Sequence, residues 1–148
     1  MRRWKPETTP SFWINHASRL LMRHFEERLR PLGFGAAYLP VVGALNEDGP
    51  LLQRDLALRA HVEQPTMAAL LLRMERDGLI ERTPHPTDKR ASQINLTPKA
   101  HETLPVAMAS HVEVAEQLLT GFTAAERATF LALLQRAAKN LAPEDEEE

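Results

Sequence analysis

Residues 64–96 read QPTMAALLLRMERDGLIERTPHPTDKRASQINL, and this stretch decides the fold. Apolar residues recur at helical spacing through its first half, which predicts a helix from Gln64 to Asp77. Pro65 is tolerated in the first turn of that helix, because its missing N–H would have no partner there. Gly78 can adopt the left-handed conformation that ends a helix. The first half is therefore predicted to be one complete helix.

The second half of the stretch has the pattern of a β-hairpin. Residues 79–83 and 92–96 each carry apolar residues two apart, as strands do. Residues 84–91 between them are too polar and too rich in proline to belong to a core. Two strands around a basic loop predict a hairpin with a protruding tip.

A second short helix is predicted immediately before this stretch. Residues 47–50 (EDGP) form a turn signal, and residues 51–60 place Leu52, Leu56 and Ala60 one helical turn apart. A tight turn at residues 61–62 then leads into the next helix. Two short helices followed by a hairpin with a cationic tip make the winged helix-turn-helix shape that reads DNA.

Four more helices are predicted around this module. The first carries an apolar stripe that Pro31 and Gly33 end; the stripe consists of Trp13, Ala17, Leu20, Leu21, Phe25 and Leu29. Residues 36–46 form the second helix, in which Pro40 predicts a kink or an early start.

The last two helices follow the hairpin. Thr97 and Pro98 cap the first of them, which Pro105 should bend, and residues 123–126 form a capping box for the helix that runs to about residue 141. The predicted fold class is mainly α with a small β-hairpin, a winged helix-turn-helix flanked by N- and C-terminal dimerisation helices.

The predicted organisation has four parts, listed by residue range: an N-terminal dimerisation helix (1–32), the winged helix-turn-helix DNA-binding domain (33–97), C-terminal dimerisation helices (98–141) and a disordered acidic tail (142–148). The outer helices carry more apolar surface than the small module can cover. A second copy of the chain would bury that surface, and two-fold symmetry would set two recognition helices ~34 Å apart. The alternative is a monomer that folds these helices back on itself.

Composition excludes several classes of protein. The chain has 148 residues and no cysteine, so disulfides, thiolate zinc sites and thiol redox sensing are excluded. Its apolar runs are shorter than the ~20 residues of a membrane span, and no apolar run follows the basic start, so we expect a cytoplasmic protein without membrane contact. The six histidines are spaced too widely to predict a metal site, and no cofactor is expected.

The net charge of −2 looks unsuited to a DNA-binding protein until its distribution is considered. The five acidic residues of 144–148 account for −5, which leaves +3 for the rest of the chain. We expect this acidic block to be a disordered tail, because its charges repel one another. The remaining excess of positive charge is small. It is consistent with a protein that binds DNA through a few well-placed cations, but it is equally consistent with an ordinary near-neutral surface.

The helix at 64–77 has an apolar face and a face that is free to bind DNA. Met67, Leu70, Leu71 and Met74 form the apolar stripe, and the free face carries Gln64, Pro65, Thr66, Ala69, Leu72, Arg73 and Arg76. Glutamine can pair with adenine, threonine can contact a phosphate or a thymine methyl group, and arginine can bind a phosphate or guanine. Apart from Leu72, these residues are the predicted major-groove contacts; the alternative is a solvated helix face.

The hairpin tip carries the second set of predicted DNA contacts. Pro84 and Pro86 stiffen a loop that presents Asp88, Lys89 and Arg90. Arginine is the residue most often inserted into a narrow minor groove, where the negative potential is strongest. We expect Asp88 to pair with an arginine and to fix its direction. The alternative is a solvated turn of mixed charge.

The residues resemble the MarR family of winged-helix regulators. The resemblance is carried by these segments: Gly49-Pro50-Leu51, Asp55-Leu56-Ala57, Val62-Glu63-Gln64-Pro65-Thr66-Met67, residues 71–80, Arg82, Pro86-Thr87-Asp88-Lys89-Arg90 and Leu96-Thr97. It is good over about residues 33–100, and the flanking helices follow the family's order. The resemblance implies a homodimer on a palindromic operator, with Gln64, Thr66 and Arg73 on the recognition helix and Arg90 at the minor groove. It also implies a transcriptional regulator, here expected to be a repressor.

Four positions depart from the family's pattern. Leu52 and Glu63 stand where a Ser or Thr usually caps a helix, His61 replaces the glycine of the turn, and Ala100 replaces another glycine. Histidine is among the residues that tolerate a positive φ, so the turn can form. The charge of Glu63 would lie close to phosphate, which bears on the details of base contact.

The resemblance further implies a small-molecule effector that binds between the outer helices and the winged helix-turn-helix. His16, Arg19, Arg23 and Tyr38 are its candidate contacts, and an anionic aromatic compound is the expected ligand; the alternative is that they are surface or interface residues. No nucleophile elbow, Gly-rich phosphate loop or HExxH motif predicts an enzyme. The remaining alternative is a winged helix that binds another protein instead of DNA.

Overall fold

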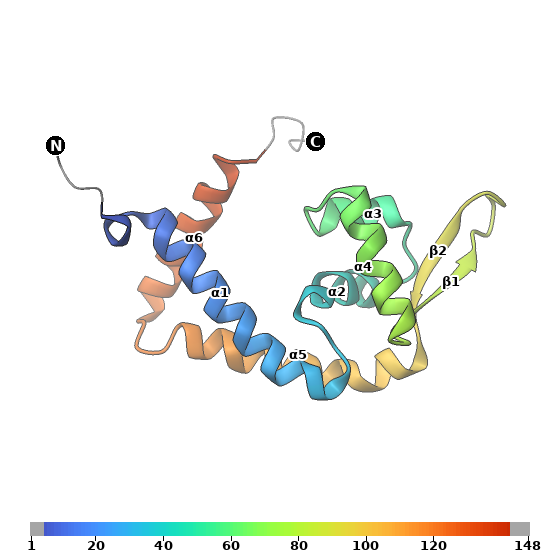
Figure 1. Ribbon diagram of the computed structural model, residues 1–148, viewed down its shortest axis with the longest axis horizontal. Helices are drawn as coiled ribbons and strands as arrows, with labels where there is room; N and C mark the ends of the chain where they lie inside the picture. The colour runs from blue at the N-terminus through green and yellow to red at the C-terminus, as the bar shows by residue number, and fades with distance from the viewer. Residues whose placement is uncertain (1–4, 143–148) are drawn as a thin grey trace. The chain divides into compact units, whose positions relative to one another are not determined.

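The structure, a computed structural model, describes residues 5–142, and the predicted acidic tail lies outside them except for Ala142. The helices are η1 (Pro6–Thr8), α1 (Pro10–Leu29), η2 (Arg30–Leu32), η3 (Ala36–Tyr38), α2 (Leu39–Asp48), α3 (Gln53–Arg59), α4 (Gln64–Arg76), α5 (Pro98–Leu118) and α6 (Ala124–Lys139). The strands are β1 (Ile80–Pro84) and β2 (Ser92–Leu96) (Figure 1). The chain forms two compact units, residues 1–114 and 115–148, so the boundary falls inside α5.

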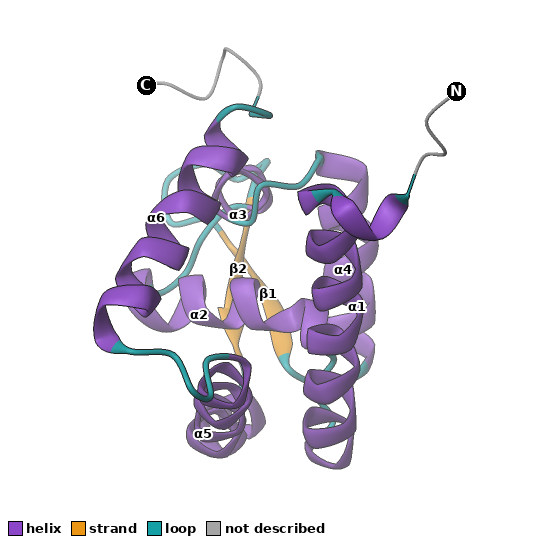
Figure 2. Ribbon diagram, turned by 90° about the vertical axis from the view of Figure 1, so that its left-hand side faces the viewer, coloured by secondary structure: helices purple, strands orange, loops and turns teal. Residues whose placement is uncertain are grey.

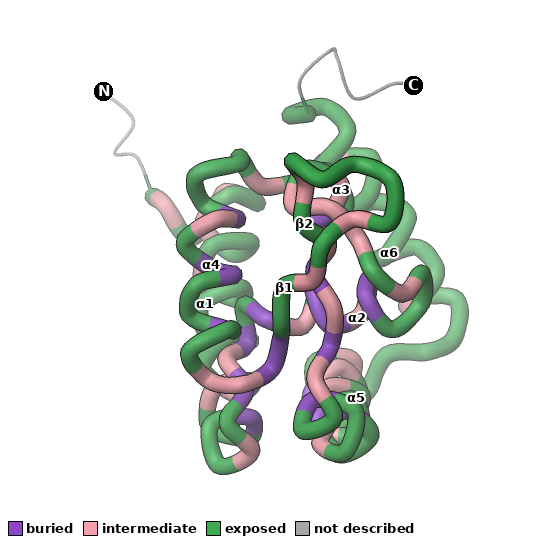
Figure 3. The backbone as a smooth tube through the Cα atoms, turned by 90° about the vertical axis from the view of Figure 1, so that its right-hand side faces the viewer, coloured by how far each residue is buried: buried purple, intermediate pink, exposed green. Residues whose placement is uncertain are grey.

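Helices α2, α3 and α4 of the first unit form a helix-turn-helix, called the reading head below. The β1–β2 hairpin that follows it is the wing. Helix α3 packs on both α2 and α4, and the β1–β2 hairpin follows α4 (Figure 2). The predicted stripe of α4, Met67, Leu70, Leu71 and Met74, is buried in the core beside Leu56, Leu79 and Ile94 (Figure 3). The predicted fold class is thereby confirmed.

Two residues with positive φ shape the ends of α4. His61 has a φ of 53° in the turn before the helix, and Gly78 has a φ of 74° after it. The His61 conformation costs little because histidine tolerates the left-handed region better than branched residues do. Neither Leu52 nor Glu63 caps its helix with a side-chain hydrogen bond, and for Leu52 this absence was predicted from its apolar side chain. The turn therefore forms without its glycine.

The hairpin is anchored by a third extended segment, which no pattern in the sequence indicates. Ile80 pairs with Leu96 and Pro84 with Ser92 in an antiparallel register. Leu51 forms a further bridge to Ile94, with N–H···O distances of 3.2 and 2.7 Å. The prediction that Leu51 begins a helix is therefore wrong, and α3 begins at Gln53. Leu52 is still extended, with a ψ of 153°, so helix α3 begins only after the bridge.

Helices α1, α2 and α5 complete the first unit. The rings of Phe25 on α1 and His111 on α5 stack with centroids 4.8 Å apart, and Arg28 forms an ion pair with Glu113 beside them. Pro40 lies in the first turn of α2, which confirms the predicted early start. Pro105 lies inside α5.

The second unit contains the end of α5 and helix α6. The predicted capping box is present: the Thr123 hydroxyl accepts a hydrogen bond of 3.1 Å from the Glu126 N–H. Arg127 and Glu116 form an ion pair with an N–O distance of 2.9 Å. None of the side chains of α6 is buried, which leaves its apolar residues available for a partner.

Candidate nucleic-acid interface

The predicted free face of α4 is exposed to solvent. Gln64, Pro65, Thr66, Ala69, Leu72, Arg73 and Arg76 are all exposed. This follows from the burial of the opposite stripe, since a helix that packs one face on the core turns the other to solvent. The Gln64 side-chain oxygen accepts a 3.2 Å hydrogen bond from Gln53 on α3. This hydrogen bond therefore links α3 to the N-terminal end of α4, which is the end that would enter a major groove.

Arg76 differs from the other predicted contacts. It lies at the C-terminal end of α4, where its Nε donates to the Asp77 carboxylate at 3.1 Å. Asp77 also accepts a hydrogen bond of 2.7 Å from the Tyr38 hydroxyl. Arg73 has no ion-pair partner among residues 5–142, so its guanidinium is available to a ligand.

The base of the wing is fixed to the reading head by side-chain contacts. Arg82 on β1 forms an ion pair with Glu75 on α4, with an N–O distance of 3.2 Å. The Thr97 hydroxyl donates to the Gly78 carbonyl at 2.6 Å, beyond the other strand. Because the wing and α4 are tied together at these points, the hairpin tip has a defined direction from the helix.

The tip of the wing is organised by two side chains. The His85 ring nitrogen Nδ1 accepts hydrogen bonds from the backbone N–H groups of Thr87 (3.2 Å) and Asp88 (3.1 Å). Asp88 in turn accepts a 2.9 Å hydrogen bond from the backbone N–H of Arg90. Asp88 therefore contacts the backbone of Arg90, and within residues 5–142 it forms no ion pair with a guanidinium, contrary to the expected pairing. Asp88 can therefore influence the direction of the Arg90 side chain only through the backbone of the turn.

Lys89 and Arg90 are exposed at this tip. Neither forms an ion pair with any described residue. An uncommitted guanidinium on a short, internally hydrogen-bonded loop can enter a groove without first breaking a salt bridge. The tip therefore presents two free cations at a defined place.

The four candidate effector contacts do not come together. His16 is half-buried on α1 beside the rings of Phe12 and Trp13, with ring centroids about 6 Å apart. Arg19 and Arg23 are exposed on the same helix. Tyr38 is 5% exposed and lines a pocket that none of the other three residues lines.

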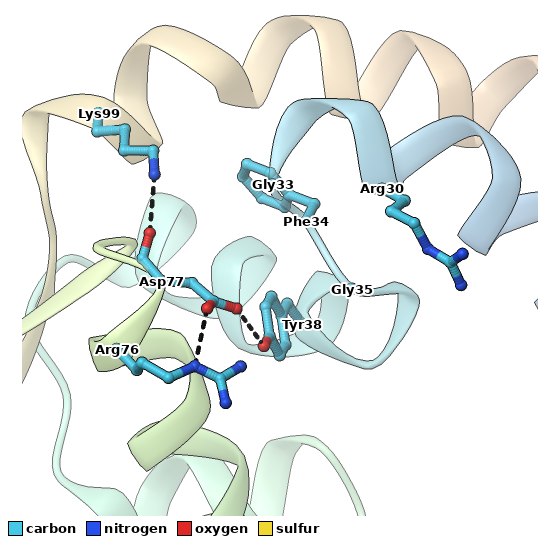
Figure 4. Close-up of a pocket in the computed structure, with 8 residues that line it drawn as sticks. All are labelled: Arg30, Gly33, Phe34, Gly35, Tyr38, Arg76, Asp77 and Lys99. Atoms are coloured by element: carbon cyan, nitrogen blue, oxygen red, sulfur yellow. Dashed lines mark hydrogen bonds and ion pairs between the residues drawn. The ribbon is translucent and has the colours of Figure 1, made fainter.

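The pocket beside Tyr38 has a volume of about 470 Å³ and lies in the first unit. Its lining residues are Arg30, Gly33, Phe34, Gly35, Tyr38, Arg76, Asp77 and Lys99 (Figure 4). Lys99 donates to the Asp77 backbone carbonyl at 2.8 Å, so its ammonium is hydrogen-bonded but not neutralised there by a carboxylate. Sequence spacing could not show that Arg30 and Lys99 line the same pocket, because they come from helices far apart in the chain.

The ionisation of Asp77 and Tyr38 is shifted by their surroundings. The hydrogen bonds from Tyr38 and Arg76 hold the pKa of the Asp77 carboxyl below its ordinary value. Burial raises the pKa of the Tyr38 hydroxyl, and its hydrogen bond to the charged Asp77 adds to that shift. Asp77 is therefore a carboxylate, and Tyr38 a neutral hydrogen-bond donor, at neutral pH.

We expect the Asp77→Asn variant to lose less stability in acid than the unaltered protein. A carboxyl whose pKa is lowered by folding stabilises the fold above its unfolded pKa of about 3.9, and the contribution disappears as the pH falls through the folded value. Urea unfolding between about pH 5 and pH 2 measures the difference. Parallel stability curves for the two proteins would show that Asp77 has no such role.

Residues 5–142 offer neither a metal-binding cluster nor a membrane-spanning helix. No group of three or more His, Asp or Glu side chains there is arranged to hold a metal ion. No helix in the same range combines the length and the apolar character that a membrane span needs.

The comparisons with known proteins agree with this geometry. The model of the MarR family matches residues 32–91, which contain the reading head and most of the wing. The HTH-type transcriptional regulator YybA of Bacillus subtilis (strain 168) is 30% identical over 104 residues, covering 70% of this chain and 69% of YybA. The homoprotocatechuate degradative operon repressor of Escherichia coli is 33% identical over 95 residues, or 64% of each chain.

A solved structure extends the likeness to nearly the whole chain. BpsR of Bordetella bronchiseptica, whose DNA binding is regulated by 6-hydroxynicotinic acid, superposes with a TM-score of 0.82 and 18% identity. The match covers 92% of this chain and 97% of that chain, and at this identity it shows the fold. Since the family model and YybA match in sequence and the fold agrees as well, the chain belongs to the MarR family of transcriptional regulators.

Proposed function

We propose that this regulator is a repressor that binds a palindromic DNA operator as a homodimer and is released by a small molecule. The observation that carries the proposal is the pair of uncommitted cations, Lys89 and Arg90, on a wing that is tied to α4. Helix α4 would enter the major groove with Gln64 and Thr66 foremost, and Arg90 would enter the neighbouring minor groove. Family membership also supports the expectation that the protein is not an enzyme.

Exposed apolar side chains support the homodimer. Helix α1 exposes Trp13 of the predicted apolar stripe (54%) and the neighbouring Ile14 (47%). In the second unit, Leu131 and Leu133 on α6 are more than half exposed. Burying such surface is favourable by about 25 cal/mol per Å², so two copies would gain by covering it. The division into dimerisation helices and a DNA-binding module at 33–97 remains part of this proposal.

The test is selection of bound fragments from random duplex DNA by the purified protein. We expect a palindrome whose half-sites are centred about 10 base pairs apart, since a two-fold dimer sets two recognition helices one DNA turn from each other. Recovery of no common sequence, together with a protein partner that binds the same helix face, would favour the protein-interaction module instead.

Gln64→Ala tests the role of the recognition helix. We expect a loss of preference for one A·T pair in each half-site, because glutamine pairs with the N6 and N7 atoms of adenine. Discrimination at that position should fall by about 1–3 kcal/mol, while binding to unrelated duplexes stays the same. Repeating the selection with the variant measures the change. An unchanged consensus would exclude Gln64 from base recognition.

An anionic aromatic effector is the second part of the proposal. The pocket at Tyr38 supports it, since its volume lies in the range of small-molecule sites and it combines aromatic rings with the cations Arg30 and Lys99. His16, Arg19 and Arg23 do not line this pocket, so their expected role as effector contacts would require a separate site on α1. The regulation of BpsR by 6-hydroxynicotinic acid and the repressor named for homoprotocatechuate degradation are consistent with such a ligand.

Calorimetric titration with salicylate and with 6-hydroxynicotinic acid tests the effector proposal. We expect heat of binding and a loss of DNA affinity, both reduced by Tyr38→Ala. Arg127→Ala is a control, because Arg127 is committed to Glu116 in the second unit. No heat and no change in DNA affinity would exclude this class of effector. A DNA-bound regulator acts where the chromosome lies, so the cytoplasm remains the expected location.

A further inference from the structure

The front of helix α4 carries no charge. Residues 64–72 contain no Lys, Arg, Asp or Glu, and Arg73 is the first cation of the helix. The commonest specific contact to guanine is a bidentate Arg or Lys. The part of the helix that enters a major groove first therefore lacks the side chains that would read guanine in this way.

An apolar strip occupies that part of the helix instead. Pro65, Ala69 and Leu72 follow one another at spacings of four and three residues, which places them on one face. All three are exposed, on the side opposite the buried stripe. Leu72 is 64% exposed, the most exposed of the large apolar side chains of α4. We call these three residues the methyl-reading strip.

The edges of the base pairs in a major groove offer one apolar group, the C5 methyl of thymine. We propose that the methyl-reading strip contacts thymine methyl groups, so that the front of α4 selects an operator by its A·T pairs. Gln64 supports this reading, because it directly precedes Pro65 in the first turn of α4 and glutamine pairs with adenine. The inference rests on the proposed DNA-binding function and names the chemistry that the helix recognises.

Replacement of thymine by deoxyuridine tests the inference without altering the protein. Deoxyuridine keeps the Watson–Crick pair and removes only the methyl group. Each thymine of the selected operator is replaced in turn, and the affinity of the full-length protein is measured by fluorescence anisotropy at one salt concentration. We expect at least two positions in each half-site where the affinity falls by about fourfold, the factor that corresponds to one buried methylene-sized group.

Leu72→Ala assigns the effect to the strip. We expect this variant to bind the thymine operator about three- to tenfold more weakly and to lose its sensitivity to deoxyuridine at one or more positions. Leu58→Ala is the matched control, because Leu58 is 70% exposed on α3 and outside the strip. It should keep the full sensitivity to deoxyuridine. Circular dichroism before and after heating establishes that both variants fold.

The outcomes separate this inference from the proposed function. If the protein binds a selected duplex tightly and every deoxyuridine substitution leaves the affinity unchanged, the DNA-binding proposal stands and the methyl-reading strip is wrong. The same conclusion holds if Leu72→Ala keeps the full sensitivity at every position. If no duplex is bound, both proposals fail together.

Discussion

Arg90→Ala should weaken specific DNA binding by about 1–3 kcal/mol. The Arg90 guanidinium has no ion-pair partner among residues 5–142, so none of these residues competes with DNA for it. Its backbone N–H is held by Asp88 at 2.9 Å, and this turn limits the freedom that binding has to remove. Anisotropy titration of the selected operator measures the loss.

The controls separate charge from geometry at this position. Arg90→Lys keeps the charge but loses the planar fork, and we expect an affinity between those of the unaltered protein and Arg90→Ala. Arg19→Ala removes an equal charge from α1 and should leave DNA affinity unchanged. If Arg90→Ala binds the operator as tightly as the unaltered protein does, the wing is not a DNA contact.

Ile94→Ala should destabilise the protein by about 2–5 kcal/mol. Ile94 is fully buried in the core of the reading head, and its backbone forms both hydrogen bonds of the bridge to Leu51. The substitution leaves a cavity at the point where the wing joins the core. Urea unfolding followed by circular dichroism measures the loss of stability.

The matched control for Ile94 is the exposed Leu58. Leu58→Ala should change stability by less than about 0.5 kcal/mol, because it removes no core contact. Equal effects of the two substitutions would mean that Ile94 does not lie in the core. Since Ile94 also anchors the wing, its variant should lose DNA affinity even at temperatures where most of the protein is folded.

The local features of the fold could be predicted from the sequence. The stripe of Met67, Leu70, Leu71 and Met74 follows from helical periodicity alone, and all four residues are buried. Gly78 and the capping box at residues 123–126 depend on the backbone of a few neighbouring residues, which is why these predictions were confirmed. The Leu51 bridge depends on Ile94, far along the chain, and no local pattern reveals it.

The chemistry at the candidate sites was less accessible to sequence reasoning. Charge and position predicted exposed cations at Lys89 and Arg90, and these are exposed. The partner of Asp88 was predicted as a side chain, but the turn brings a backbone N–H to it first. Tyr38 ends η3 and Asp77 directly follows α4, so their contact appears only when the chain is folded.

The measurement that tests the central claim most directly is the salt dependence of DNA affinity. The account predicts that the logarithm of the association constant falls linearly with the logarithm of the salt concentration, with a slope of about −0.9 for each phosphate contact. Several contacts per dimer should give a steep line for duplex DNA of the selected sequence. Absence of binding even in dilute buffer, or an affinity that does not change with salt, would contradict the account.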